Sequence, residues 1–260
     1  MKVTILGCGS STGVPRVGND WGACDPAEPK NRRSRCSILV EEAGLVENER
    51  TRLLVDTSPD LRQQLLDAEI DDLDAVIYTH EHADQTHGID DLRVLFMRKR
   101  ARLPVYGDAN LLAIMRRRFD YIFEQPPGSG YPPIAESFEI GIGEGFEIGA
   151  INGCSFAQQH GSIVSLGLRF GPVAYSNDVH QLDDAAFAAL EGVEVWIVDA
   201  LRYEPHPTHA HLDLTLEWIA RVKPRRAILT NMHVDMDYQT LRGSLPAGVE
   251  PGYDGMIIET

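Results

Sequence analysis

Short runs of apolar residues, bounded by turn-forming residues, recur along the chain and predict β-strands. They lie at Val3–Leu6, Ser37–Val40, Arg52–Val55, Ala75–Tyr78, Leu103–Tyr106, Phe146–Ile148, Val164–Phe170, Val173–Tyr175, Val195–Val198 and Ala227–Leu229. Helical periodicity between some of these runs predicts helices at Asp60–Ala68, Asp90–Arg98, Asn110–Tyr121, Asp183–Leu190 and Leu212–Val222. Strands dominate the first half, and strands alternate with helices in the second. The pattern therefore indicates sheets covered by helices, in an α/β or layered α+β architecture.

The domain organisation follows from length and from the one candidate linker, the Gly- and Pro-rich segment Pro126–Pro133. Strand-like segments of similar composition lie on both sides of it, so we interpret it as a surface loop. The chain has 260 residues, and roughly 150 residues per domain allow one or two domains. Without an internal repeat or a clear linker, we expect a single domain over residues 1–260.

The charge balance limits the class of partner. The chain has 24 Lys and Arg residues against 39 Asp and Glu residues, a formal net charge of −15. Proteins that bind large nucleic acids usually carry a basic surface, so we expect no such partner. A small anionic substrate is still compatible with this charge, because a bound metal ion can reverse the local field.

The cellular setting is expected to be the cytoplasm. No apolar run approaches the roughly 20 residues that span a bilayer, so no membrane partner is expected. The segment Met1–Gly7 enters a strand directly and carries no signal sequence. The four cysteines, Cys8, Cys24, Cys36 and Cys154, are too few in a chain of this length for a disulfide framework.

A histidine-rich motif directly follows the predicted strand Ala75–Tyr78. Its residues His80, His82 and Asp84 alternate with other residues, and in an extended segment two residues at this spacing project to the same side. Both imidazoles can therefore meet one cation, with the carboxylate placed for a second. Imidazole together with carboxylate suits zinc, manganese or iron.

Further candidate ligands occur at the ends of other predicted strands. His160 precedes one strand, Asp178 follows another, and His233 follows the strand Ala227–Leu229. Asp56 ends the strand Arg52–Val55 and is suited to orienting a ligand imidazole. Each residue alone is more often structural, but together they predict strand ends that converge on one edge.

Two other features have more than one interpretation. Eight basic residues lie between Arg93 and Arg118, and they are either the solvated faces of two helices or, for some of them, phosphate-facing groups. The glycines of Gly7–Gly13 are spaced one residue away from the dinucleotide-binding fingerprint, and no helical pattern follows them. A tight turn, or a glycine-rich loop over the active site, is the better interpretation.

Taken in order, Asp56, the block from His80 to Asp84, His160, Asp178 and the Asn231–His233 segment resemble the metallo-β-lactamase superfamily. Within it, the segments Gly7–Gly9, Val14–Pro15, Arg35–Ser37 and Leu245–Met256 are most similar to the phosphoribosyl 1,2-cyclic phosphate phosphodiesterases of the carbon–phosphorus lyase pathway. The resemblance implies a four-layer αββα sandwich of the α+β class. It also implies hydrolysis of a phosphodiester, commonly a cyclic one, by a metal-bound hydroxide.

The sequence departs from this superfamily at ligands of the second metal ion. Gln85 and Asn231 stand where histidines are usual, and in each case a histidine, His87 or His233, follows two residues later. We predict His233 as a ligand and leave Gln85 and His87 open. The subgroup can also carry a structural zinc near the N-terminus. Here Asn19, Trp21 and Val234 replace its ligands and only Cys24 remains, so we expect that zinc to be absent.

The expected cofactor is a pair of divalent ions, zinc or manganese, with an uncertain second site. The predicted metal ligands are His80, His82, Asp84, His160, Asp178 and His233. The predicted catalytic residues are Asp84 and His211, because the resemblance places His211 at a substrate-contacting position, as phosphate contact or general acid. His206 and His209 lie in the same histidine-rich turn. They are either further candidates for donating a proton to the leaving group or parts of an exposed turn. Asp199 is a weaker candidate for orienting a ligand.

The expected function is hydrolysis of a small cyclic or nucleotide-like phosphodiester. Two alternatives remain. One is an RNA-processing nuclease of the ribonuclease Z type, which the charge of −15 and the lack of a long inserted arm disfavour. The other is a non-hydrolytic accessory protein that resembles the B protein of pyrroloquinoline quinone biosynthesis. A homodimer is compatible with the sequence, which does not determine the oligomeric state.

Overall fold

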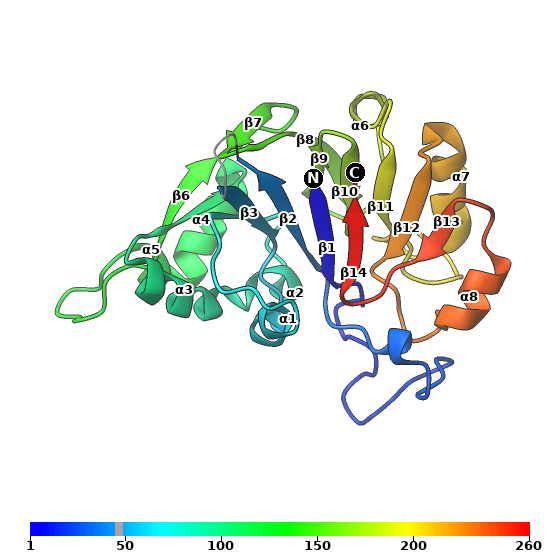
Figure 1. Ribbon diagram of the computed structural model, residues 1–260, viewed down its shortest axis with the longest axis horizontal. Helices are drawn as coiled ribbons and strands as arrows, with labels where there is room; N and C mark the ends of the chain where they lie inside the picture. Colours follow the sequence, from blue (N-terminus) through cyan, green and yellow to red (C-terminus); the bar gives the residue numbers. More distant parts are fainter. Residues whose placement is uncertain (45–48) are drawn as a thin grey trace.

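The computed structural model describes residues 1–44 and 49–260, and their strands form two seven-stranded sheets (Figure 1). In spatial order, the first sheet contains β14 (Met256–Glu259), β1 (Lys2–Gly7), β2 (Ser37–Ala43), β3 (Arg50–Val55), β4 (Ala75–Ile77), β5 (Leu103–Gly107) and β6 (Ala135–Glu139). The second contains β13 (Val249–Pro251), β12 (Arg226–Thr230), β11 (Val195–Asp199), β10 (Val173–Ser176), β9 (Ile163–Phe170), β8 (Ile151–His160) and β7 (Gly145–Ile148).

Helices cover the outer faces of both sheets. Those on the side of the first sheet are α1 (Leu61–Asp67), α2 (Ala83–Thr86), α3 (Leu92–Lys99), α4 (Ala109–Arg118) and α5 (Asp120–Phe123), and those on the side of the second are α6 (Asp184–Ala189), α7 (Leu212–Val222) and α8 (Tyr238–Ser244) (Figure 1). Two short 3₁₀ helices span Pro29–Asn31 and Ile89–Asp91. No helix within the described residues is both long and apolar enough to cross a membrane.

Alternate residues of β3 and β4 enter two different cores, which explains why Leu53–Val55 and Ala75–Ile77 read as continuous apolar runs. In β3, Leu53 and Val55 join the core shared with the second sheet, whereas Leu54 joins the core beneath α1, α3 and α4. In β4, Ile77 joins the core shared with the second sheet, and Val76 joins the core beneath the helices. A strand that is buried on both faces has no polar positions to alternate with.

The strand order brings the ends of several strands to one edge. From β3 to β6 the neighbours are parallel, as they are from β10 to β13. Parallel strands present their carboxyl ends on the same side, where open sheets of this kind place ligands. Asp56, Asp178 and Asn231 follow strands at this edge, and each has a positive φ, of 63°, 52° and 61°. Such values are uncommon outside glycine, although Asp and Asn adopt them more readily than most residues do.

The sequence pattern did not predict four of the strands, and it predicted one helix where the structure has two. The missed strands are β6, β8, β13 and β14. Strand β8 is long and ends in Gln158, Gln159 and His160, so it lacks an apolar run, and its pairing with β9 makes it a strand. The helix expected over Asn110–Tyr121 is two helices, because the chain breaks at Phe119, where φ is −130° and ψ is 44°. The segment Pro126–Pro133 lies in the loop between α5 and β6, as predicted.

Candidate metal centre

Three histidines from the two sheets meet at the shared edge. His80 and His82 follow β4, and His160 ends β8. The ring centroids of the three imidazoles are 4.7, 5.2 and 5.0 Å apart. One ring nitrogen from each lies within 4.8 Å of the others, the arrangement of ligands around a single ion.

Hydrogen bonds fix the orientation of two of these imidazoles. The Thr79 hydroxyl donates to Asp56 Oδ2 at 2.8 Å, so it accepts from His80 Nδ1 at 3.0 Å. His160 Nδ1 donates to the Thr208 carbonyl at 2.7 Å. In both rings this leaves Nε2 as the atom with a free lone pair, as in many metal-binding histidines. Asp56 therefore acts on His80 through Thr79.

The buried atoms of this group fit a metal ion. His80 Nε2 is buried, and it has no hydrogen-bond partner among residues 1–44 and 49–260. His160 Nε2 lies 3.2 Å from His82 Nδ1. Burial, followed by the neighbouring imidazoles, lowers the pKa of His80 well below its ordinary value. Burial and then the charge of His209 lower the pKa of His160 to about 4. Neutral imidazoles are the form that binds metal.

Asp178 lies beside this group and receives several hydrogen bonds. Gln85 Nε2 and Asn177 Nδ2 donate to its Oδ2 at 3.0 and 2.6 Å, and Asn231 Nδ2 donates to its Oδ1 at 3.2 Å. His209 Nδ1 lies 3.3 Å from Oδ1 of the same carboxylate. Ligand atoms of His160, Asp178 and His209 also lie within 4.8 Å of one another.

The buried carboxylates of the site are disfavoured in their ionised form unless a positive charge lies near them. Burial, followed by the charge of Asp84, raises the pKa of Asp178 well above its ordinary value. Burial raises the pKa of Asp56 to about 8. The pKa of His209 is lowered by burial but raised more strongly by Asp199, at 3.2 Å, and by Asp178, to about 9. A cation at the histidine group would stabilise the ionised form of these carboxylates.

Comparison with known families decides the classification. The family described as the beta-lactamase superfamily domain matches residues 51–232. The chain belongs to the β-lactamase superfamily. That range contains the three histidines and Asp178, and the arrangement of sheets and helices confirms the predicted α+β sandwich with helices on both outer faces.

Several proteins of known structure share the superfamily fold. A new diphosphatase from the PhnP family is 33% identical, with a TM-score of 0.88 over 99% of this chain and 96% of that one. Zn²⁺-bound PqqB from Methylobacterium extorquens is 17% identical, with a TM-score of 0.75 over the full length of both chains. The short form of human tRNase Z is 15% identical, with a TM-score of 0.66 over 100% of this chain and 99% of that one. These last two likenesses concern the fold alone.

One curated relative is named for a different activity. The octanoyltransferase of Porphyromonas gingivalis (strain ATCC BAA-308 / W83) is 32% identical over 98% of this chain. The chain covers 51% of that protein, so it spans about half the length of the relative.

The fold brings some of the predicted site residues together and leaves others apart. His80, His82, His160 and Asp178 belong to the groups of possible ligands. Asp84 is half-buried and accepts from Gln85 Nε2 at 3.3 Å. His87 is exposed, with its ring against Phe119.

His233 and His211 lie outside the two groups of possible ligands found among the described residues. Both ring nitrogens of His233 have other partners, since Nδ1 donates to Asp235 at 2.9 Å and Nε2 accepts from Arg16 at 3.4 Å. His211 is the residue before α7, and its carbonyl accepts from Thr215 N at 3.0 Å. The structure thus places His209, and not these two residues, beside Asp178.

Local sequence pattern contains only a weak signal for His209. Its turn contains three histidines, and nothing in the local pattern distinguishes them. The useful signal was Asp199, a carboxylate at the end of β11, because its Oδ2 lies 3.2 Å from His209 Nδ1. A buried carboxylate at the site edge requires a partner, and the nearby turn supplies one.

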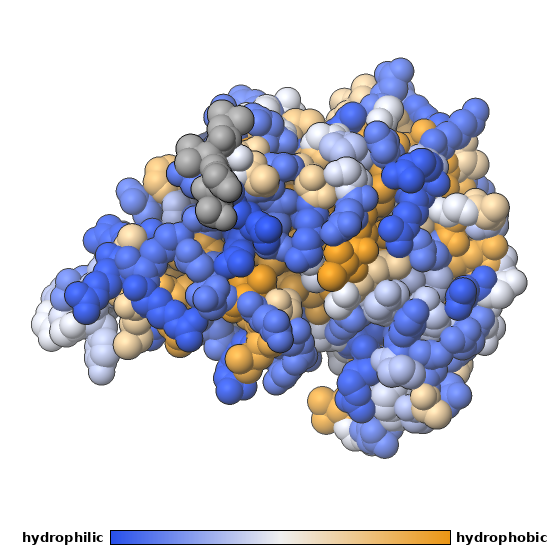
Figure 2. All heavy atoms as spheres, viewed as in Figure 1, coloured by the Kyte–Doolittle hydropathy of each residue, from blue (hydrophilic) through white to orange (hydrophobic). Residues whose placement is uncertain are grey.

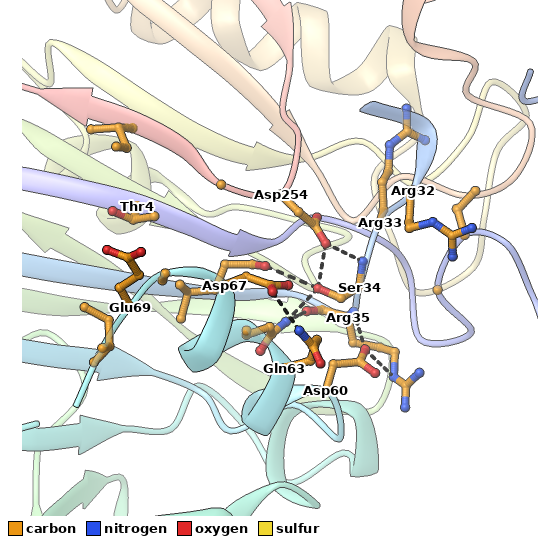
Figure 3. Close-up of a pocket in the computed structure, with 18 of the residues that line it drawn as sticks. Thr4, Arg32, Arg33, Ser34, Arg35, Asp60, Gln63, Asp67, Glu69 and Asp254 are labelled. Carbon is orange, nitrogen blue, oxygen red and sulfur yellow. Dashed lines mark hydrogen bonds and ion pairs between the residues drawn. The ribbon is translucent and has the colours of Figure 1, made fainter. Parts of the chain in front are cut away.

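The expected loss of the N-terminal structural zinc concerns a different region. There, Cys24 packs with Val14, Val234 and Trp21, and its thiol donates to the Val234 carbonyl at 3.2 Å. A cavity of about 640 Å³ lies nearby, between the N-terminal loops and α1 (Figure 3). It is lined by Ser34 and Asp254, whose side chains are hydrogen-bonded at 2.7 Å, and it includes no residue of the metal centre.

Proposed function

We propose that this chain is a metal-dependent hydrolase of a small phosphodiester or diphosphate. The observation that carries the proposal is the convergence of three imidazoles, those of His80, His82 and His160, beside Asp178. The 33% identical diphosphatase supports a phosphorus ester as the class of substrate. A cyclic or nucleotide-like phosphate, the substrate that the sequence favours, belongs to this class.

The three histidines and Asp178 would hold the ion, and imidazole with carboxylate suits zinc or manganese. When bound, a divalent ion of this kind supplies an ionised water near neutral pH and neutralises phosphate charge. Asp56 and Thr79 hold His80 in the tautomer that presents Nε2. The Thr208 carbonyl does the same for His160.

A cationic side chain lies close to the ligands, which supports an anionic substrate despite the net charge of −15. The Arg118 guanidinium donates to the carbonyl of Glu81, the residue between His80 and His82. Arg118 is exposed, so its remaining N–H groups are available to a phosphate. Hydrophilic residues also cover most of the face in Figure 2, with apolar residues in smaller areas between them.

We assign the contact with the leaving group to His209 in place of His211. The ring of His209 lies 4.6 Å from that of His160 and touches Asp178, whereas His211 belongs to neither ligand group among the described residues. An imidazole at this position is suited to donating a proton to a departing alkoxide or phosphate.

A substrate screen tests the proposal. The purified protein, supplied with Zn²⁺ or Mn²⁺, is assayed on bis-p-nitrophenyl phosphate, a cyclic ribose phosphate, a 2′,3′-cyclic nucleotide, a dinucleoside diphosphate, a precursor tRNA and an octanoyl thioester. We expect turnover of at least one small phosphorus ester, abolished by chelation and by His80→Ala. His87→Ala is the matched control, because His87 lies outside the ligand groups described by the structure.

Three outcomes would contradict the proposal. Cleavage of the precursor tRNA alone would indicate a ribonuclease Z type of activity. Reaction of the thioester alone would indicate an activity related to that named for the Porphyromonas gingivalis relative. A folded, metal-loaded protein that turns over none of these compounds would favour the non-hydrolytic accessory protein.

A further inference from the structure

The region across Asp178 from the three histidines contains nitrogen donors where a second ion would need ligands. The Gln85 side-chain nitrogen lies 3.3 Å from an Asp84 oxygen and 3.0 Å from an Asp178 oxygen. One NH₂ group has two hydrogens. It therefore joins the two carboxylates that a second cation would otherwise join.

Asp178 is surrounded by further donors. Its carboxylate accepts from the side-chain amides of Gln85, Asn177 and Asn231, and His209 Nδ1 lies 3.3 Å away. An ionised carboxylate has about four lone-pair positions. The three amide N–H groups use three of those positions, and His209 lies against Oδ1, so the carboxylate has no pair of free positions with which to bridge two ions.

The orientation of the Gln85 amide depends on whether a second cation is bound. In the orientation that the structure shows, Gln85 Oε1 is buried and has no partner among the described residues. If the amide were turned round, that oxygen would face the carboxylates of Asp84 and Asp178, and only a cation between them would make this favourable. The orientation in the structure thus corresponds to one bound ion, and the reversed orientation corresponds to two.

His209 occupies space on the same side of Asp178. Its Nδ1 lies 3.2 Å from Asp199 Oδ2 and 3.1 Å from Asn231 Nδ2. Asn231 is smaller than the histidine usual at its position in the superfamily. The ring of His209, from a different loop, lies against this shorter side chain.

We propose that this chain binds a single divalent ion through His80, His82, His160 and Asp178, and that Gln85, Asn231 and His209 replace the second ion of the superfamily site. The inference rests on the proposed metal dependence, but it concerns the number of ions and not the substrate. It replaces the expectation of two ions with one ion and a set of hydrogen-bond donors that hold Asp178.

The test counts ions and detects their proximity. The protein is loaded with excess Mn²⁺, desalted, and examined by elemental analysis and electron paramagnetic resonance. We expect one manganese ion per chain and the six-line signal of an isolated Mn²⁺. The variants Gln85→His and Gln85→His/Asn231→His restore imidazoles to the second site. We expect the double variant to bind two ions with an exchange-coupled signal. Gln63→His, at an exposed position of α1, is the matched control and should still bind one.

Other results would overturn the proposal in distinguishable ways. Two exchange-coupled ions in the unmodified protein would show that the second site is intact. If His209→Ala then reduced two ions to one, His209 would be a ligand of the second ion. A protein that binds no ion would contradict the metal-dependent function as well. Circular dichroism of each variant checks that the count refers to folded protein, and the single variant Gln85→His provides the comparison if the double variant does not fold.

Discussion

At the scale of single residues, Arg118 links the metal-binding segment to the charge of the substrate. Its guanidinium donates to the Glu81 carbonyl between two ligand histidines. We predict that Arg118→Ala raises KM for a phosphodiester about tenfold and changes kcat little, because a charge-assisted hydrogen bond to phosphate contributes about 1.5 kcal/mol or more. Steady-state kinetics on the substrate found by the screen measures this effect.

Arg117 provides the comparison for Arg118. It is the preceding residue of α4 and is exposed, and no hydrogen bond or ion pair of its side chain occurs among the residues that the structure describes. Arg117→Ala should leave KM within about twofold, because exposed charges are screened by salt. Equal effects of the two substitutions would mean that net charge, and not the position of Arg118, determines binding.

At the scale of elements, Asp237 connects α8 to the N-terminal loop. Its carboxylate accepts from Thr240 N at 2.9 Å at the start of the helix, from Asp25 N at 3.1 Å and from Asn31 Nδ2 at 2.7 Å. We predict that Asp237→Ala lowers the free energy of unfolding by about 1–2 kcal/mol, through loss of the helix cap and of a buried partner for Asn31. Urea unfolding measures the change.

The stabilisation by Asp237 should depend on pH. Burial raises the pKa of Asp237, but hydrogen bonds from the Thr240 backbone, from Asn31 and from the Asp25 backbone lower it more, to about 2. The folded-state pKa is thus below the unfolded value of about 3.9, so the contribution is present above pH 4 and is lost as the pH falls towards 2. The difference in stability between the protein and Asp237→Asn should shrink over this range. The exposed Glu217→Gln, in α7, is the control and should show a difference near zero throughout.

At the scale of the whole molecule, the metal centre joins the two sheets. His80 and His82 come from the first sheet, and His160 and Asp178 come from the second. We predict that removing the ion with a chelator lowers Tm, because an ion that binds only the folded state at 100 times its Kd stabilises it by about 2.7 kcal/mol. Differential scanning calorimetry with and without metal measures the shift.

Two histidine variants make this prediction specific. In His160→Ala, addition of metal should no longer raise Tm, whereas in His233→Ala the metal-dependent increase should persist, since both ring nitrogens of His233 have protein partners. A metal response that is lost in His233→Ala and kept in His160→Ala would place the ion at a different site.

Local pattern was sufficient for much of the fold and for the first half of the site. The second half of β3, Leu53–Val55, and all of β4 are apolar because they are buried on both faces, and this is visible in sequence. His80 and His82 are two residues apart at a strand end, so their shared side follows from backbone geometry alone. By contrast, β8 is polar, and its ten residues are held as a strand by pairing with β9.

The sequence by itself thus determined the layered α+β class, the positions of most strands, and the histidine pair with Asp178 and His160 as candidates. Only the tertiary structure shows that His209 lies beside Asp178, whereas His211 and His233 belong to neither group of possible ligands among the described residues. That placement depends on which loop of the second sheet reaches the carboxylates of Asp178 and Asp199, at 3.3 and 3.2 Å from His209. Sequence spacing carries no information about such a contact, because it forms between loops that the pairing of the strands brings to the same edge.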